Sequence, residues 1–252
     1  MQHTDRDVMC TTKKIGMEYQ KGFVVFLDIL GFKEFICTKE NEVKKVFSIF
    51  DFSEKIRHLY NDKNLNGVKI EFFSDSFVLT TEAVSVEAFS MIMIACHLLN
   101  LHIYKETGLC TRGAIVIGKF YHAKGIVFGP GIINAYQLEN QKAKYIRMLV
   151  DKEVADFINN PIMIQKSSDG YYHYNWYVLA IQDCFKDGIF QKDKASVLAR
   201  KYRDILTELL SQYRNTEVYE KYFWLTYLYN DFCRILNQYD EQGEYIELLI
   251  EE

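Results

Sequence analysis

The chain has 252 residues, of which 49 % are hydrophobic and 15 % aromatic, enough to bury the core of one large domain or of a domain with an appendage. Its formal net charge of -4 argues against a dedicated nucleic-acid binder. The N-terminal residues are polar, and the nearly apolar run 88–99 is too short to span a bilayer. The six Cys form no CxxC pair. These features predict a cytoplasmic protein that binds no membrane.

Hydrophobic periodicity predicts the elements in chain order. A loose polar arm (1–20) precedes a buried strand (23–28), a helix (40–60), a hairpin (68–80), a buried helix (84–104) and a central strand (111–118). A short return strand (121–128), a helix from Gly129-Pro130-Gly131 to Lys144, a strand (145–150) and a helix capped by Asp151 (152–159) follow. A hairpin (162–180) and helices from Ala195 onward, the last over 216–237, end the chain.

The order of these elements predicts an α+β architecture. Helices after the first and third strands would pack on one face of a mixed, largely antiparallel sheet, as in the ferredoxin-like plan. We expect an N-terminal arm (1–20), a catalytic domain (21–160) and a C-terminal hairpin with a helical extension packed on that domain (161–252).

Two acidic residues stand at predicted strand ends. Asp28 ends the apolar run Phe23–Leu27, and Gly31 allows the backbone to turn close beside it. Asp75 lies at the tip of the hairpin, and the ferredoxin-like plan places that hairpin beside the first strand. Two carboxylates at adjacent strand ends can hold divalent cations, which in turn bind phosphates. The sequence therefore predicts a metal site at this end of the sheet.

These motifs resemble those of the class III nucleotide cyclases over roughly residues 20–155. Asp28-Ile-Leu-Gly31-Phe32 is similar to the first metal motif of that family, and Ser74-Asp75 to the second. Arg112 to Gly118 keeps the spacing of the family's Arg and Gly strand, and Arg147 falls on the position of a phosphate-contacting Lys. The resemblance implies the class III cyclase catalytic fold.

The resemblance also implies roles for individual residues. Asp28, Asp75 and the Ile29 carbonyl would hold two divalent cations, Mn²⁺ or Mg²⁺, and the backbone N–H groups of Gly31, Phe32 and Lys33 would cradle the β- and γ-phosphates. Arg147 would stabilise charge on the reacting phosphate. In the family that residue comes from the partner subunit, which implies a homodimer with active sites at the interface.

The chain departs from the family at the residues that read the base. The position of the transition-state Arg holds Gln137, the Asn of the same helix is displaced to Asn134, and the base-reading Lys position holds Glu71. With these changes the chain looks most like the bacterial pyrimidine cyclases of Pycsar anti-phage systems. That likeness implies a phosphorus–oxygen lyase converting UTP to 3',5'-cyclic UMP and pyrophosphate, whose product signals to a separate effector protein.

Other interpretations stay open. The substrate could be CTP, giving cyclic CMP, or a purine nucleotide. Gln137 in place of Arg would also suit a non-catalytic, cyclase-like nucleotide-binding module. A palm-type nucleotidyltransferase shares the two-metal logic, although a primer site would need a strongly basic face. Arg147 could make a surface ion pair, and Glu71 could be an outward strand residue. The six His lack the spacing of a zinc site.

Overall fold

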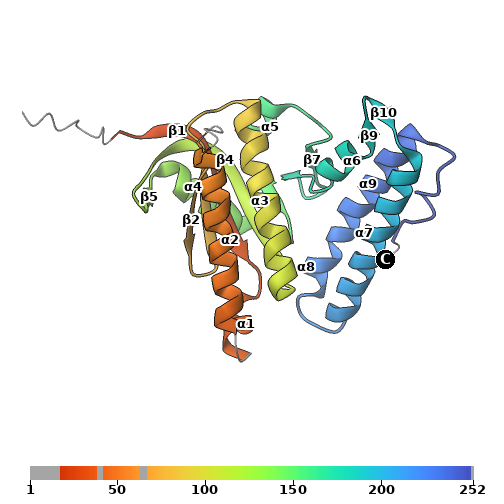
Figure 1. The fold of residues 1–252 in the computed structure, drawn as a ribbon, viewed down its shortest axis with the longest axis horizontal. Coiled ribbons are helices and arrows are strands. Elements are labelled where there is room, and N and C mark those ends of the chain that lie inside the picture. The colour runs from red at the N-terminus through yellow and green to blue at the C-terminus, as the bar shows by residue number, and fades with distance from the viewer. Residues whose placement is uncertain (1–17, 39–41, 63–66, 251–252) are drawn as a thin grey trace, which may run out of the picture.

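A computed structural model describes residues 18–38, 42–62 and 67–250 of the chain, so most of the predicted N-terminal arm lies outside the described residues. One mixed sheet organises the described part, with its strands in the order β2-β3-β1-β4-β6-β8-β7 and β5 paired on β4 (Figure 1). Helices cover both faces of this sheet, and a separate helical region follows it along the chain.

The first four strands form a ferredoxin-like core. They are β1 (Gln20–Ile29), β2 (Lys69–Phe73), β3 (Ser76–Thr80) and β4 (Thr111–Ala123), with α1 (Phe32–Thr38), α2 (Glu42–Asp62) and α3 (Val86–Thr107) between them. Every neighbouring pair in the order β2-β3-β1-β4 is antiparallel, and β1 lies between β3 and β4. The predicted strand order and the central position of the first strand are therefore confirmed.

The next elements extend the sheet beyond β4. They are β5 (Ile126–Phe128), α4 (Pro130–Lys142), β6 (Met148–Val150), α5 (Lys152–Ile158), β7 (Ile164–Lys166) and β8 (Tyr172–Tyr174). Strand β6 runs parallel to β4, whereas β8 and β7 continue antiparallel. Pro130 stands in the first turn of α4, and the Asp151 side chain accepts a hydrogen bond from the Glu153 N–H at the start of α5. The predicted α+β class with a mixed, largely antiparallel sheet is confirmed.

Two helix layers sandwich the sheet. Helices α2 and α3 lie side by side over one face (Figure 1), where a core of buried residues that includes Phe23, Leu27 and Phe89 packs beneath them. Helix α4 covers the opposite face along β1 and β4, with Val24, Phe120 and Ala135 in its smaller core. Because side chains alternate along a strand, the even-numbered residues of β1, including Asp28, share the face of α4.

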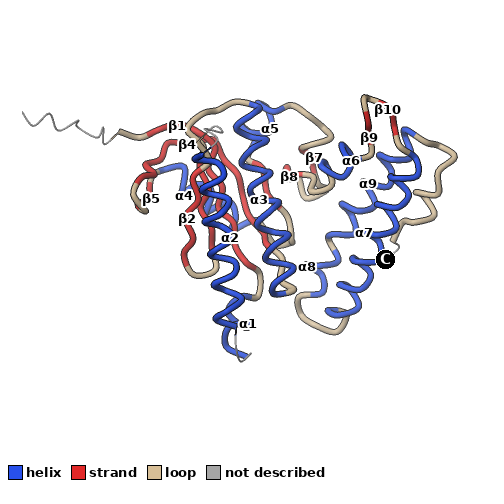
Figure 2. The backbone as a smooth tube through the Cα atoms, viewed as in Figure 1, coloured by secondary structure: helices blue, strands red, loops and turns tan. Residues whose placement is uncertain are grey.

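The C-terminal part builds a second core. Its elements are α6 (Val178–Asp183), β9 (Phe185–Lys186), β10 (Ile189–Phe190), α7 (Lys192–Tyr213), α8 (Tyr219–Phe223) and α9 (Leu225–Tyr239), drawn mostly as helix in Figure 2. Residues of α7 and α9 pack there with Leu30, Cys110 and Ile146 from the sheet region. The buried faces of these helices thus meet one another and also one end of the sheet.

Several predicted boundaries shift. The return strand expected over 121–128 is the end of β4 plus β5, because Lys124 and Gly125 take left-handed φ values of 54° and 74° and turn the chain. The strand expected from Tyr145 begins only at Met148, and the helix expected over 216–237 is divided at Trp224. Helix α3 begins two residues and ends three residues later than the predicted helix over 84–104. Among the described helices, α3 alone has the length and hydropathy to span a bilayer, although its buried residues contribute to the core of the sheet.

Candidate active site

Backbone pairing brings the two predicted metal ligands together. Asp28 stands opposite Ser76 in the β1–β3 ladder, so Asp75 is the residue just beyond that pair. The N–H of Ile29 donates to the Asp75 carbonyl at 2.8 Å, which ties the hairpin tip to the end of β1. Ser74 turns the chain with a left-handed φ of 57°. Both carboxylates are only partly buried and lie at the same edge of the sheet.

A third charged side chain lies on the neighbouring strand. Arg112 of β4 stands opposite Asp28 in the β1–β4 ladder, and its Nε donates to Asp28 Oδ2 at 3.1 Å. Its Nη1 donates to the Ala143 carbonyl, also at 3.1 Å. Burial raises the pKa of Asp28, the Arg112 guanidinium opposes that rise, and the nearby Asp75 charge adds to it. Arg112 therefore neutralises part of an acidic pair.

Glu139 completes this group from helix α4. Gly131, Ala135 and Glu139 recur every four residues and form the buried stripe of the helix. The helix can approach β4 closely because Gly118 has no side chain. A Cβ at that position would lie only 2.5 Å from the Gly131 Cα. This packing leads the last turn of α4 to Arg112, whose Nε lies 2.9 Å from Glu139 Oε1.

The Glu139 carboxylate carries an unusual charge balance. Its side chain is 3 % exposed, and Oε1 accepts no well-aligned hydrogen bond although the Arg112 Nε is close. Burial raises the pKa of Glu139 to about 7; the Arg112 charge works against this shift, whereas Asp28 and Asp75 reinforce it. Glu139 is consequently a buried acid that ionises near neutral pH.

The donor set fits a hard divalent cation. Mg²⁺ and Mn²⁺ commonly use one or two carboxylates and complete their shell with water and substrate phosphates, which is what Asp28 and Asp75 offer. Among the described residues, no group of three or more His, Cys, Asp or Glu side chains could hold a metal alone. The site therefore suits metals that arrive with a phosphorylated substrate better than a closed structural metal site.

The loop after Asp28 has the predicted glycine turn. Gly31 has a φ of 82°, a conformation that L side chains rarely adopt. Phe32 then starts α1 with its ring buried, and Lys33 is exposed. A cavity of about 440 Å³ lies beside Leu30 and Gly31 and is lined on its other side by residues of the helical region, among them Tyr213 and Tyr222.

The predicted residues on α4 point elsewhere. Asn134 and Gln137 are exposed, whereas the stripe that faces the sheet ends at Glu139. Within this chain they are thus separated from Asp28 by the helix itself. Ile29 is buried, so only its backbone could serve as a ligand. The catalytic role of Gln137 and the substrate-binding role of Asn134 stay predictions.

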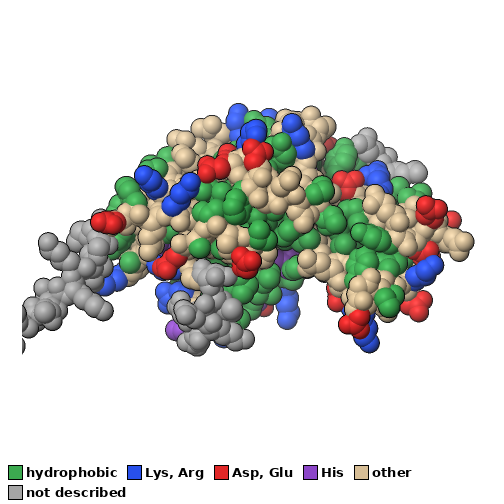
Figure 3. Space-filling view, turned by 90° about the horizontal axis from the view of Figure 1, so that it is seen from above, with side chains coloured by type: hydrophobic (Ala, Val, Ile, Leu, Met, Phe, Trp, Pro, Cys, Tyr) green, Lys and Arg blue, Asp and Glu red, His purple; other side chains and the backbone are tan. Residues whose placement is uncertain are grey.

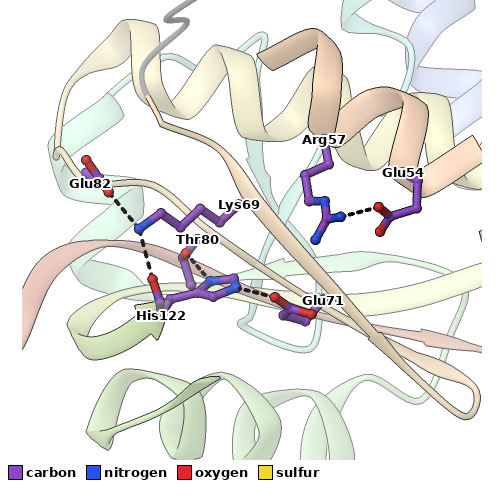
Figure 4. Close-up of polar contacts among 7 residues, drawn as sticks. All are labelled: Glu54, Arg57, Lys69, Glu71, Thr80, Glu82 and His122. Atoms are coloured by element: carbon purple, nitrogen blue, oxygen red, sulfur yellow. Dashed lines mark hydrogen bonds and ion pairs between the residues drawn. The ribbon is translucent and has the colours of Figure 1, made fainter. Parts of the chain in front are cut away.

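Glu71 of β2 belongs to a polar network that includes residues of β3 and β4, drawn in Figure 4. His122 lies between Thr80 and Glu71, with its Nδ1 2.7 Å from Thr80 Oγ1 and its Nε2 3.3 Å from Glu71 Oε1. Donation by Nε2–H to the carboxylate leaves Nδ1 to accept from the Thr80 hydroxyl. Lys69 donates to the His122 carbonyl and pairs with Glu82. His122 is 3 % exposed, so this network orients the Glu71 carboxylate, which is itself part-exposed.

Arg147 lies in a different environment from the one predicted for it. It precedes β6 in a bend, and its side chain is 1 % exposed. The guanidinium pairs with Asp169 and donates to Ser167 Oγ at 3.2 Å. The guanidinium carbon also lies 5.3–5.9 Å from three aromatic ring centres, those of Tyr145, Trp224 and Tyr171. Its proposed contact with a partner's phosphate would require this cage to open.

Sequence reasoning did not assign Arg112 or Glu139 to the site. One available signal was Arg112 itself, the charged residue of the otherwise apolar run 112–118. The second was the four-residue spacing of Gly131, Ala135 and Glu139, which puts Glu139 on the sheet-facing stripe. Neither signal indicates how α4 is oriented on β4, so neither predicts that Glu139 lies beside Arg112.

No family model matches the chain, and a search of curated proteins found no match. Several solved structures are similar. The guanylyl cyclase domain of a rhodopsin fusion protein from the fungus Blastocladiella emersonii has a TM-score of 0.48 at 16 % identity, covering 62 % of this chain and 95 % of that one. A guanylate cyclase domain from Catenaria anguillulae, solved with GTP, has a TM-score of 0.44 at 15 % identity, covering 62 % and 94 %.

A class III adenylyl cyclase-like ATP-binding protein from Pseudomonas aeruginosa has a TM-score of 0.37 at 12 % identity, covering 75 % of this chain and 44 % of that one. These structural neighbours are class III nucleotide cyclase domains or resemble them. All three TM-scores lie below 0.5.

Proposed function

We propose that this chain is a nucleotide cyclase, which converts a nucleoside triphosphate to its 3',5'-cyclic monophosphate and pyrophosphate. The observation that supports it best is the backbone pairing that holds Asp28 and Asp75 at one sheet edge with Arg112 beside them. Two carboxylates and a guanidinium suit a metal-bound triphosphate, which carries several negative charges.

Each residue would have a defined task in that reaction. Metal ions held by Asp28, Asp75 and the Ile29 carbonyl would activate the ribose 3'-hydroxyl and neutralise the triphosphate. Gly31, with its left-handed φ, leaves the backbone N–H groups of residues 31–33 room to approach the phosphates. Arg112 places a positive charge next to the carboxylates without any movement of a distant element.

We further propose a homodimer with active sites at the interface. On the sheet face shared with α4, large hydrophobic side chains are exposed, including Phe73, which is 85 % exposed, and Ile133 and Tyr136 of α4. Exposed apolar residues of this size are typical of protein interfaces. Burial of this surface against a second copy would bring Asn134 and Gln137 to the interface, and Arg147 could contact the partner's phosphates if its cage opened.

The face seen in Figure 3 mixes Lys and Arg with Asp and Glu and carries no continuous basic stripe. A nucleic-acid primer site would need such a stripe to neutralise phosphates. The candidate site lies at the opposite end of the molecule, where α1 follows Asp28 at the bottom of Figure 1. The formal net charge of -4 favours a free nucleotide as substrate over the nucleotidyltransferase alternative.

The base is proposed in two ranked versions. The resemblance to the pyrimidine cyclases favours UTP, with cyclic UMP as a messenger for a separate effector in anti-phage defence. One observation favours CTP as the second candidate. The Glu71 carboxylate is oriented by His122 and is an obligatory acceptor when ionised, so it would pair with the cytosine 4-amino group and repel the uracil 4-carbonyl. This preference applies if Glu71 faces the base.

Product analysis tests the proposal. The protein is incubated with each of the four triphosphates and Mn²⁺, and the products are identified by mass. Formation of cyclic UMP or cyclic CMP is expected, and initial rates rank the two bases. A faster reaction with ATP or GTP would exclude the pyrimidine assignment. Binding of a nucleotide by calorimetry without any turnover would instead identify a non-catalytic module.

A further inference from the structure

One guanidinium nitrogen lies between two carboxylates at the candidate site. The Arg112 Nε is 3.1 Å from Asp28 Oδ2 and 2.9 Å from Glu139 Oε1, but it makes a well-aligned hydrogen bond only to Asp28. Oε1 of Glu139 is buried and accepts no hydrogen bond. A buried carboxylate oxygen without a donor costs free energy. The site therefore contains an unused acceptor within reach of a donor that is engaged elsewhere.

The present partner of Arg112 is also the predicted metal ligand. A divalent cation on Asp28 would compete with the guanidinium for the same carboxylate, because two cations sharing one small anion repel each other. A guanidinium with no other anion nearby would resist displacement. Glu139 supplies that second anion, and the Arg112 Nη1 contact with the Ala143 carbonyl, in the segment that follows α4, keeps the guanidinium near the end of the helix.

We propose that Arg112 is an exchangeable counter-ion of the metal site, transferring its hydrogen bond from Asp28 to Glu139 when a divalent cation binds. Glu139 is then a positioning residue that sets metal affinity without touching the metal. This inference deepens the proposed function, because it assumes that Asp28 binds a metal. It assigns no role to the base or to the effector.

Two single variants have opposite expected effects on metal binding. Arg112→Gln removes the competing cation and should tighten Mn²⁺ binding about tenfold. Glu139→Gln removes the anion that receives the guanidinium, and should weaken Mn²⁺ binding by a similar factor. Simple charge effects would give the same two signs, so the single variants alone do not decide the question.

The double variant separates transfer from simple charge. If Arg112 moves to Glu139, loss of Glu139 matters only while Arg112 is present, and Glu139→Gln should change Mn²⁺ affinity less than about twofold in the Arg112→Gln background. If the two charges act independently, Glu139→Gln should weaken binding by the same factor in both backgrounds. The non-additive result supports the proposal, and the additive result overturns it.

Mn²⁺ binding to the full chain is measured by electron paramagnetic resonance without nucleotide, at about pH 8, where Glu139 is ionised because its pKa is about 7. Arg234→Gln is the matched control, because it removes an Arg from an exposed ion pair on α9 and should leave the affinity unchanged. Circular dichroism verifies that each variant is folded.

The remaining outcomes are also decisive. If Arg112→Gln does not fold, Arg112→Met takes its place in the cycle. Unchanged or tighter Mn²⁺ binding by Glu139→Gln in the presence of Arg112 overturns the proposal whatever the Arg112 variants do. Absence of Mn²⁺ binding by the unaltered chain without nucleotide would overturn this inference but not the proposed function, because the metals of a cyclase can arrive with the triphosphate and product formation tests that function separately. Normal binding with additive variants would overturn this inference only.

Discussion

Two arginines lie side by side at one end of the sheet, but their side chains differ in exposure and in the residues that they contact. Arg112 immediately precedes Gly113, whose N–H donates to the Arg147 carbonyl, so the two residues are neighbours across β4 and β6. Arg112 is 23 % exposed and shared between two carboxylates, whereas Arg147 is 1 % exposed and enclosed by aromatic rings. Of the pair, Arg112 has the surroundings of a residue that handles ligands, and Arg147 has those of a residue that holds the fold.

The largest expected effect is loss of turnover at the carboxylates beside Arg112. Asp28→Ala and Asp75→Ala should each lower product formation by about 10³-fold or more, because each removes a charged ligand from a partly exposed site rather than a core contact. Cyclic nucleotide is quantified by mass spectrometry at saturating Mn²⁺, and far-ultraviolet circular dichroism verifies the fold. Near-normal turnover by either variant would contradict the two-metal interpretation.

Thermal unfolding tests whether Arg147 contributes more to the stability of the fold than Arg112 does. Arg147→Ala should lower the free energy of unfolding by about 3 kcal/mol, because it empties an aromatic cage around a buried side chain and removes the ion pair with the part-exposed Asp169. Arg112→Ala should cost less, about 1–2 kcal/mol, because Glu139 can take up a proton when its counter-ion is lost. Melting temperatures measure both, with exposed Arg200→Ala as the control. Equal losses would erase the distinction between the two arginines.

Mixed dimers test whether Arg147 nevertheless acts across an interface. An Asp75→Ala chain mixed with an Arg147→Ala chain should recover up to about a quarter of normal activity, since half of the dimers would be mixed and each would hold one whole site. Subunit exchange is verified with labelled chains. Recovery would show that the cage opens in the dimer; no recovery despite exchange would leave Arg147 with its structural role alone.

The smallest expected effect is a pH-dependent change in stability from Glu139. Its pKa is raised by burial from 4.5 to about 7, so between these pH values the folded chain holds a proton that the unfolded chain has released, and stability falls as pH rises. Glu139→Gln should remove this fall and raise the melting temperature by a few degrees above about pH 7, at roughly 2–4 °C per kcal/mol. Melting curves from about pH 5 to pH 8 measure it. Parallel pH profiles for the two proteins would contradict the assigned pKa.

Local patterns predicted the elements well but not the contacts between them. The apolar run ending at Asp28 and the hairpin around Asp75 needed only strand alternation to be recognised, and their adjacency followed from the strand order. Arg112 and Glu139 met because two glycines, Gly118 and Gly131, let α4 approach β4 closely. This close packing of α4 on β4 depends on the fit between two segments that are distant in the sequence, and no periodicity of the sequence predicts it.

Arg147 illustrates the opposite limit. The sequence placed Arg147 after a predicted helix and at the start of an apolar run. Its contacts, however, come from Asp169 on the loop between β7 and β8 and from Trp224 between α8 and α9. Each of these residues lies more than 20 positions along the chain, and sequence alone does not indicate which distant aromatic ring packs on a given guanidinium. Environment, and not motif position, distinguishes the two arginines.

The second core has a consequence for protein engineering. Leu30, two residues after Asp28, packs with the C-terminal helices, as do Cys110 and Ile146, so the scaffold of the sheet edge is shared with residues beyond 180. A shortened chain ending near residue 160 would expose these apolar side chains and the flank of Arg147 to water. Fusion partners or tags are therefore better joined at the ends of the full chain than inserted in place of its last helices.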